Sequence, residues 1–349
     1  WSLYPWILFF FYRLASRPTR AYFLAALVSY SLLLMTHNIS AMLFTPFLGL
    51  YVLWQAIAHR NTPFAFYPLV AFVGAIGVAA VFLVPALGEA RYTQVDVLTK
   101  GYFDVATHFI SWKELLASTP RLDYRAINPP IPFNLGRMHV LLALLGGLAI
   151  VLPTPDRERR LHLLFALLFA LLLAWMMTPA SLIVWRTVPG IAFAEFPTRL
   201  FGVLFLFTSF LAGASLLWLR TWPRLQWGVA TLGGLALILA VAPYQFPRPF
   251  LSLDLTPAGF VRFEPAFNAL GTTSAGEFLT IWSSRSPADS VITPTLARVA
   301  LIAPPPTVEA EVIAETAHSL RLRASTPSTT TVDVAQFYFP GWRAWVDGK

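Results

Sequence analysis

Glu195 and Arg199 are the residues best suited to chemistry, and they flank the tripeptide Phe-Pro-Thr. A proline followed by a threonine is typical of a helix start. The first turn of a helix attracts anions, and an arginine in that turn adds charged donors for a phosphate. Two interpretations stay open: a site in which Arg199 binds phosphate and Glu195 has a catalytic role, or a purely structural ion pair.

Glu89 and Arg91 form a second acid-base combination, just after the apolar run 64–87. At the mouth of a cavity, Glu89 would act as a general base on an acceptor hydroxyl and Arg91 would bind a phosphate. Alternatively, the two residues form a structural ion pair or an anchor at the membrane interface.

His37 and Asn38 stand between two apolar runs. A polar pair without partners in hydrocarbon costs several kcal/mol, so both side chains need partners. They either cap a helix junction in headgroup water, or face a cavity and act there as a proton acceptor or a phosphate contact.

Signals for metals and cofactors are weak. The chain has no cysteine, and Asp96, Asp104 and Asp123 are isolated from one another. The sequence contains no histidine cluster suited to zinc. It also contains no glycine-rich phosphate loop, no serine nucleophile elbow and no HExxH helix. We therefore predict no metal site and no required cofactor, while a divalent metal stays open.

Composition makes the lipid bilayer the expected partner. Of 349 residues, 57% are hydrophobic and 12% are charged. In a typical soluble domain, about 25% of the residues are charged. The net charge of +8 comes from arginines scattered between apolar blocks, so we do not expect nucleic acid. A span needs about 20 apolar residues, and the runs predict about eight spans. They lie at 1–12, 21–36, 39–57, 64–87, 137–153, 161–179, 199–219 and 226–244.

Arginines mark every second connection between these runs. By the positive-inside rule, the arginine-rich short connections are cytoplasmic. The loops 88–136 and 180–198, and everything after Pro247, are then outside. We therefore predict a multi-pass protein of the cell membrane. The basic residues of the cytoplasmic connections are Arg13, Arg17, Arg20, His59, Arg60, Arg157, Arg159, Arg160, Arg220 and Arg224.

The loop 88–136 is long enough to suggest a binding or gating role. After Asp104, the apolar residues of the run 105–117 recur at helical spacing, with Trp112 among them. This spacing predicts a short amphipathic helix on the membrane surface.

Two domains are predicted: an all-α membrane domain over 1–246 and an outward β-rich domain over 247–349. In the second domain, residues 308–313 and 319–323 alternate between apolar and polar side chains, which is typical of strands. A short helix is expected at 278–282.

Residues 337–346 are also predicted to form a strand. Asp347-Gly348 is the preferred pair for a tight hairpin turn, and the partner strand would come after Lys349. Because the chain also starts inside an apolar run, we expect it to be a fragment of a longer protein.

Several motifs, read in order, resemble one family of bacterial and archaeal multi-pass proteins. That family is described as "6-pyruvoyl-tetrahydropterin synthase-related" membrane proteins and is similar to YfhO-like and other proteins with the C-type glycosyltransferase fold. The motifs are Thr36-His37-Asn38, Pro132-Phe133-Asn134-Leu135-Gly136, Glu195-Phe196-Pro197-Thr198-Arg199, Thr273-Ser274-Ala275-Gly276-Glu277-Phe278-Leu279 and Phe339-Pro340-Gly341-Trp342-Arg343-Ala344-Trp345-Val346-Asp347-Gly348-Lys349.

The resemblance implies a polyprenyl-phosphate sugar as donor, an envelope glycan, lipid or protein as acceptor, and a catalytic acid in the first outward loop. Residues 35–39, the first outward connection, contain no acid and so depart from that pattern. A second hypothesis therefore stays open, namely a non-catalytic membrane protein that binds or transports a lipid-linked or cell-envelope polymer. Pterin chemistry is not expected.

Overall fold

The computed structural model describes most of the N-terminal two thirds of the chain and short stretches of the remainder. The described residues are 1–59, 65–118, 133–153, 156–241, 256, 259, 275–283, 299–301, 309–316, 318–325, 329, 332–334 and 338–347. Some predicted features lie outside the described residues. They are the helix start at 64, the helix end at 242–244, Pro132, Asp123 and Gly348, the second residue of the predicted hairpin turn.

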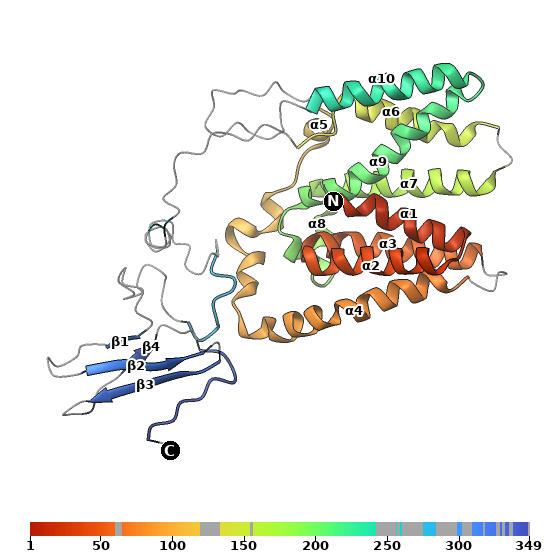
Figure 1. The fold of residues 1–349 in the computed structure, drawn as a ribbon. Helices are drawn as coiled ribbons and strands as arrows, with labels where there is room; N and C mark the ends of the chain where they lie inside the picture. The colour runs from red at the N-terminus through yellow and green to blue at the C-terminus, as the bar shows by residue number, and fades with distance from the viewer. Residues whose placement is uncertain are drawn as a thin grey trace. The chain divides into compact units, whose positions relative to one another are not determined.

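Helices dominate the described residues, and a helix lies at each position predicted from hydropathy (Figure 1). The long helices are α1 Leu3–Ser16, α2 Arg20–Thr36, α3 Asn38–Ala58, α4 Tyr67–Glu89, α6 Arg137–Leu148, α7 Arg157–Met176, α9 Phe201–Ala214 and α10 Pro223–Val241. The shorter helical turns that matter below are η3 Gly101–Phe103, η4 Val105–Thr107, α5 Trp112–Leu115, η7 Ile191–Ala194 and η8 Pro197–Leu200.

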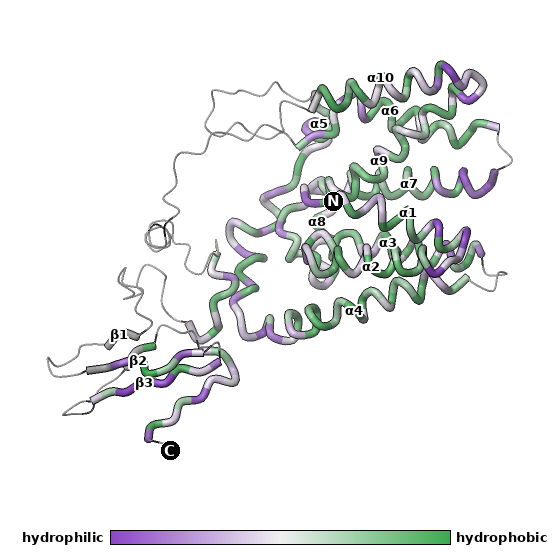
Figure 2. Tube along the Cα trace, in the orientation of Figure 1, coloured by the Kyte–Doolittle hydropathy of each residue, from purple (hydrophilic) through white to green (hydrophobic). Residues whose placement is uncertain are grey.

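In the part of the chain that the structure describes, four helical segments are long and apolar enough to cross a membrane. They are Asn38–Ala58, Tyr67–Tyr92, Arg157–Met176 and Pro197–Leu219. Figure 2 shows hydrophobic residues along most of each helix and hydrophilic residues gathered near helix ends. A side chain on such a surface has lipid as its natural solvent, so the helices indicate a membrane protein.

Side chains that cap backbone N–H groups explain where several helices begin. Thr19 accepts a hydrogen bond from the backbone of Tyr22 and starts α2. Asp156 accepts one from the backbone of Arg159 and starts α7. Such caps satisfy donors that the first turn leaves without partners.

Small residues allow two helix pairs to approach closely. A Cβ atom added to Gly146 of α6 would lie 1.6 Å from the carbonyl oxygen of Leu211 in α9. On α4, Ala71, Ala75 and Ala79 form a buried stripe, and the Ser31 hydroxyl of α2 donates to the Ala75 carbonyl at 3.3 Å. Helices in lipid gain stability mainly from such close packing, because lipid tails are as apolar as the side chains.

The C-terminal part contains two antiparallel strand pairs among the described residues. Strand β1 Val299–Leu301 pairs with β4 Val332–Val334, and β2 Glu309–Glu315 pairs with β3 Leu320–Ser325. The strands predicted from alternation at 308–313 and 319–323 are therefore confirmed as β2 and β3.

Two predictions for the C-terminal part are wrong. The strand predicted at 337–346, of which residue 337 lies outside the described residues, is absent over 338–346. The chain turns there at Pro340-Gly341, where the backbone N–H of Trp342 donates to the Phe339 carbonyl at 3.1 Å and Gly341 has φ 113°. Residues 278–282 form no helix, because Thr280 instead makes a β-bridge to Thr93.

The predicted amphipathic helix over 105–117 is also wrong as a continuous element. Asp104 does cap a helical turn, η4, but that turn ends at Thr107. Ser111 then starts the separate one-turn helix α5, because Ser111 and Glu114 form a reciprocal capping box. A capping box satisfies two orphan N–H groups at once, and so it favours a new helix start at Ser111 over continuation of η4.

Contacts divide the chain into two compact units. The first unit comprises Trp1–Ala86 and Leu98–Arg248, and the second comprises Leu87–Val97 and Pro249–Lys349. The second unit thus includes the end of α4 and the residues that follow it, Leu87–Val97. There, Gln94 Nε2 donates to the carbonyls of Thr280 at 2.9 Å and Ser283 at 3.3 Å.

Candidate functional site

The backbone at Glu195 has a rare conformation. Its φ is 60° and its ψ is −54°, and the N–H of Phe196 donates to the Ala194 carbonyl at 2.6 Å across it. These values describe a γ-turn with positive φ, which is strained for any residue with a Cβ. Strain of this kind costs about 1–3 kcal/mol and is concentrated at binding and catalytic sites.

The turn places the Glu195 carboxylate against Arg199. Nη2 of Arg199 donates to Oε2 of Glu195 at 3.1 Å, and 7% of the Glu195 side chain and 32% of the Arg199 side chain are exposed. Both residues flank η8, which starts at Pro197 and leads into α9. The helix start predicted at Pro197-Thr198 is therefore present, as a 3-10 turn.

Arg199 keeps one donor group unused. Its Nη1 atom is buried and has no hydrogen-bond partner among the described residues. Its guanidinium carbon lies 5.0 Å from the centroid of the Phe196 ring, which covers one side of the group. A buried guanidinium donor without a partner carries a desolvation cost, which an anionic ligand would remove.

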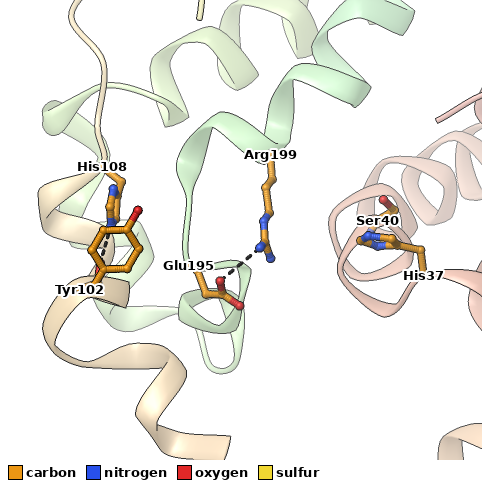
Figure 3. A network of polar contacts seen from close by, with 6 residues as sticks. All are labelled: His37, Ser40, Tyr102, His108, Glu195 and Arg199. Carbon is orange, nitrogen blue, oxygen red and sulfur yellow. Dashed lines mark hydrogen bonds and ion pairs between the residues drawn. The ribbon is translucent and has the colours of Figure 1, made fainter. Parts of the chain in front are cut away.

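Three aromatic residues of the loop 88–136 surround Phe196. The ring centroid of His108 lies 4.5 Å from that of Phe196, and those of Tyr102 and Phe103 lie 6.2 and 6.3 Å away. Nε2 of His108 also contacts the Tyr102 carbonyl, which holds the imidazole in place (Figure 3). Sequence reasoning missed these three residues, since only the fold brings η3, which contains Tyr102 and Phe103, and His108, which directly follows η4, to Phe196.

His37 acts as a helix cap. Its Nδ1 accepts a hydrogen bond from the backbone N–H of Ser40 at 3.1 Å, and Asn38 is the first residue of α3. Helix α3 also contacts η7, the turn just before Glu195. Figure 3 shows His37 and Ser40 at the first turn of α3, in the same part of the first unit as the Glu195–Arg199 pair. The capping interpretation therefore accounts for His37.

Glu89 and Arg91 belong to the second unit, whereas Arg199 belongs to the first. Glu89 ends α4. Nη2 of Arg91 donates to the Tyr92 hydroxyl at 2.6 Å, and its guanidinium carbon lies 4.7 Å from the Tyr92 ring centroid. Tyr92 stacks in turn on Trp282, with centroids 5.8 Å apart. Arg91 thus belongs to an aromatic cluster, and its proposed phosphate contact stays a prediction.

No group of three or more histidine, aspartate or glutamate side chains suited to a metal ion occurs within the described ranges. The prediction that no cofactor is required stays a prediction.

The fold and the site define a class of protein: a mainly helical membrane protein in which a partly buried Glu–Arg pair lies beside an aromatic cluster. Comparisons with protein-family models, curated proteins and solved structures find no match for this chain. The resemblance to C-type glycosyltransferases therefore stays a prediction.

Proposed function

We propose that this protein transfers a sugar from a polyprenyl-phosphate donor to an envelope glycan, lipid or protein on the outer face of the membrane, with Arg199 binding the donor phosphate. The observation that supports this proposal best is that the two terminal nitrogens of the Arg199 guanidinium differ in their hydrogen bonding. Nη2 is held by Glu195, while the buried Nη1 has no partner among the described residues. A phosphate oxygen is a strong, charged acceptor for such a donor.

Glu195 orients the guanidinium in this proposal. A carboxylate that fixes one side of an arginine reduces the conformational entropy that phosphate binding must overcome. Because the turn at Glu195 is strained, the surrounding structure must hold the carboxylate in place. Its second role is to orient the acceptor hydroxyl beside the bound donor.

The aromatic cluster of Tyr102, Phe103, His108 and Phe196 is suited to the sugar. Ligand sites combine aromatic walls with a few polar groups that fix orientation. Here three walls come from the loop 88–136 and the fourth is Phe196, and the polar groups are Glu195 and Arg199.

The topology that goes with this proposal has about eight spans, with the arginine-rich short connections in the cytoplasm. The loops 88–136 and 180–198 and the C-terminal unit are then outside. An outer-face site suits a lipid-linked donor, because the donor's phosphate lies at headgroup depth while its chain stays in the bilayer.

The test is donor turnover by the full-length protein in nanodiscs. Release of polyprenyl phosphate is measured from a panel of polyprenyl-phosphate sugars for the wild type, Arg199→Lys and Glu195→Gln. Arg186→Lys, a change at an exposed arginine of the helix Leu182–Thr187, is the matched control. We expect release by the wild type and the control, and strongly reduced release by both site variants.

No release from any donor by folded wild-type protein would overturn the transferase proposal. The non-catalytic hypothesis would then be examined by measuring whether the protein binds polyprenyl phosphate without turnover.

A further inference from the structure

A large cleft opens between α1, α7 and α9 of the first unit, with a small contribution from α3. Its volume is about 960 Å³. Most of the lining is apolar and includes Leu8, Phe9, Phe165, Phe205 and Phe210. The mechanism proposed above uses none of these residues.

One end of the cleft is polar. Asp156, Glu158, Arg159 and His162 line it, and all four lie at or near the start of α7. The start of a membrane-length helix lies at the depth of lipid headgroups, and the residues further along it lie at the depth of the acyl chains. The cleft therefore has the same order of polar and apolar surfaces as a single lipid molecule.

Both ring nitrogens of His162 have hydrogen-bond partners within the protein. Its Nδ1 lies 2.9 Å from the Glu158 carbonyl oxygen, which can only accept, so Nδ1 carries the proton. Nε2 lies 3.2 Å from the Tyr51 hydroxyl and 3.3 Å from Gln55 Nε2. The imidazole of His162 is therefore held by residues of α3 and α7.

The carboxylate of Glu158 lacks a paired cation within the lining. Arg159 pairs with Asp156 instead, with Nη2 and Oδ2 3.6 Å apart. Oε1 of Glu158 is buried and has no hydrogen-bond partner in the described part of the chain. A buried carboxylate oxygen of this kind favours a ligand that brings a positively charged N–H donor.

We propose that the cleft binds one lipid with a phosphoethanolamine headgroup, whose ammonium donates to Glu158 and whose acyl chains lie between α1, α7 and α9. An ethanolamine ammonium has three N–H donors, whereas a choline headgroup carries the same charge without any. A glycerol headgroup offers hydroxyl donors but leaves the lipid with a net negative charge, which the Glu158 carboxylate disfavours. This proposal does not depend on the transferase function.

The test is lipid binding to the full-length protein in detergent, followed by native mass spectrometry. The protein is titrated separately with phosphatidylethanolamine, phosphatidylcholine and phosphatidylglycerol of the same acyl composition. We expect one tightly bound phosphatidylethanolamine, with an affinity about tenfold above that of phosphatidylcholine, as one charged hydrogen bond provides.

Two variants test the contribution of the headgroup to binding separately from that of the acyl chains. Glu158→Gln should remove the preference for ethanolamine over choline and leave binding of the chains intact. Ser209→Trp fills the cleft from an exposed small residue of α9 and should block all three lipids. Val81→Trp on α4, where the side chain is 73% exposed, is the matched control and should bind as the wild type does.

Equal affinities of the wild type for ethanolamine and choline lipids, or strongest binding of phosphatidylglycerol, would overturn the headgroup assignment. Unchanged binding by Ser209→Trp would overturn the assignment of the lipid to this cleft. Donor turnover at Arg199 is measured on the same variants, so the two proposals can fail separately.

Discussion

Nη2 of Arg199 lies 3.1 Å from Oε2 of Glu195, while Nη1 of the same guanidinium is buried without a partner among the described residues. Because arginine has a planar fork of donors, it can hold a carboxylate with one arm and a phosphate with the other. A lysine offers a single charged nitrogen and cannot bridge both groups in the same geometry.

Arg199→Lys should therefore weaken binding of polyprenyl phosphate by about 10-fold or more, which corresponds to one lost charged hydrogen bond of about 1.5–3 kcal/mol. The dissociation constant is measured with the full-length protein in nanodiscs, and Arg186→Lys serves as the control. Equal constants for the wild type and Arg199→Lys would show that the phosphate binds elsewhere.

The strained turn at Glu195 can be tested separately from its charge. In an Arg199→Met background the ion pair with Arg199 is already absent, so Glu195→Gly and Glu195→Ala both remove the same carboxylate together with its other contacts. Only glycine adopts φ 60° without strain. The glycine double variant should be more stable than the alanine double variant by about 1 kcal/mol, measured by thermal unfolding in detergent. A more stable alanine variant would contradict the strained turn.

Phe196 should contribute through its aromatic ring. It contacts His108 and the Arg199 guanidinium at centroid distances of 4.5 and 5.0 Å. Phe196→Leu should lower donor turnover about threefold to tenfold, because aromatic and cation–π contacts provide about 0.5–1.5 kcal/mol. Phe196→Tyr keeps the ring and should retain most of the activity. Equal losses in the two variants would argue against a role of the ring.

Gly146 should be intolerant of any side chain. Since a Cβ there would lie 1.6 Å from the Leu211 carbonyl oxygen, Gly146→Ala must push α6 away from α9. We expect a loss of about 1–3 kcal/mol or more in stability. Gly77→Ala in α4 is the matched control, because its Cβ would meet nothing within 4 Å. A thermal midpoint unchanged by Gly146→Ala would contradict the close α6–α9 contact.

The one-turn helix α5 should depend on pH. Hydrogen bonds from the Ser111 backbone and side chain lower the pKa of Glu114 below its ordinary value. A carboxyl group whose pKa is lowered in the folded state stabilises that state at pH values above the group's ordinary pKa. This stabilisation is lost as the pH falls through the lowered pKa.

Hydrogen exchange of the peptide containing Leu115 and Leu116 measures this effect. Protection, corrected for intrinsic exchange, should be constant near neutral pH and should fall at pH values below the ordinary pKa of Glu114. Glu114→Gln keeps a capping side chain without a titrating group, so its protection should not change with pH. The same pH dependence in both proteins would assign the effect to another group.

The helices were predictable because their signal is local. A run of about 20 apolar residues predicts a membrane helix wherever it folds, and a helix is present at each predicted position. The strand pair β2–β3 was predictable from alternation for the same reason. The wrong predictions at 105–117 and 338–346 lie where one local contact, a capping box or a turn at glycine, overrode the hydrophobic pattern.

The sequence by itself therefore determined the membrane character of this protein, the positions of its helices and the presence of an acid and an arginine around Pro197. Only the tertiary structure decided that Glu195 is buried in a strained turn, that Arg199 keeps a donor without a partner among the described residues, and that residues of the distant loop at 102–108 surround Phe196. The physical reason is that spacing along a chain sets helix and strand periods, whereas burial and contacts between distant segments depend on how the helices pack.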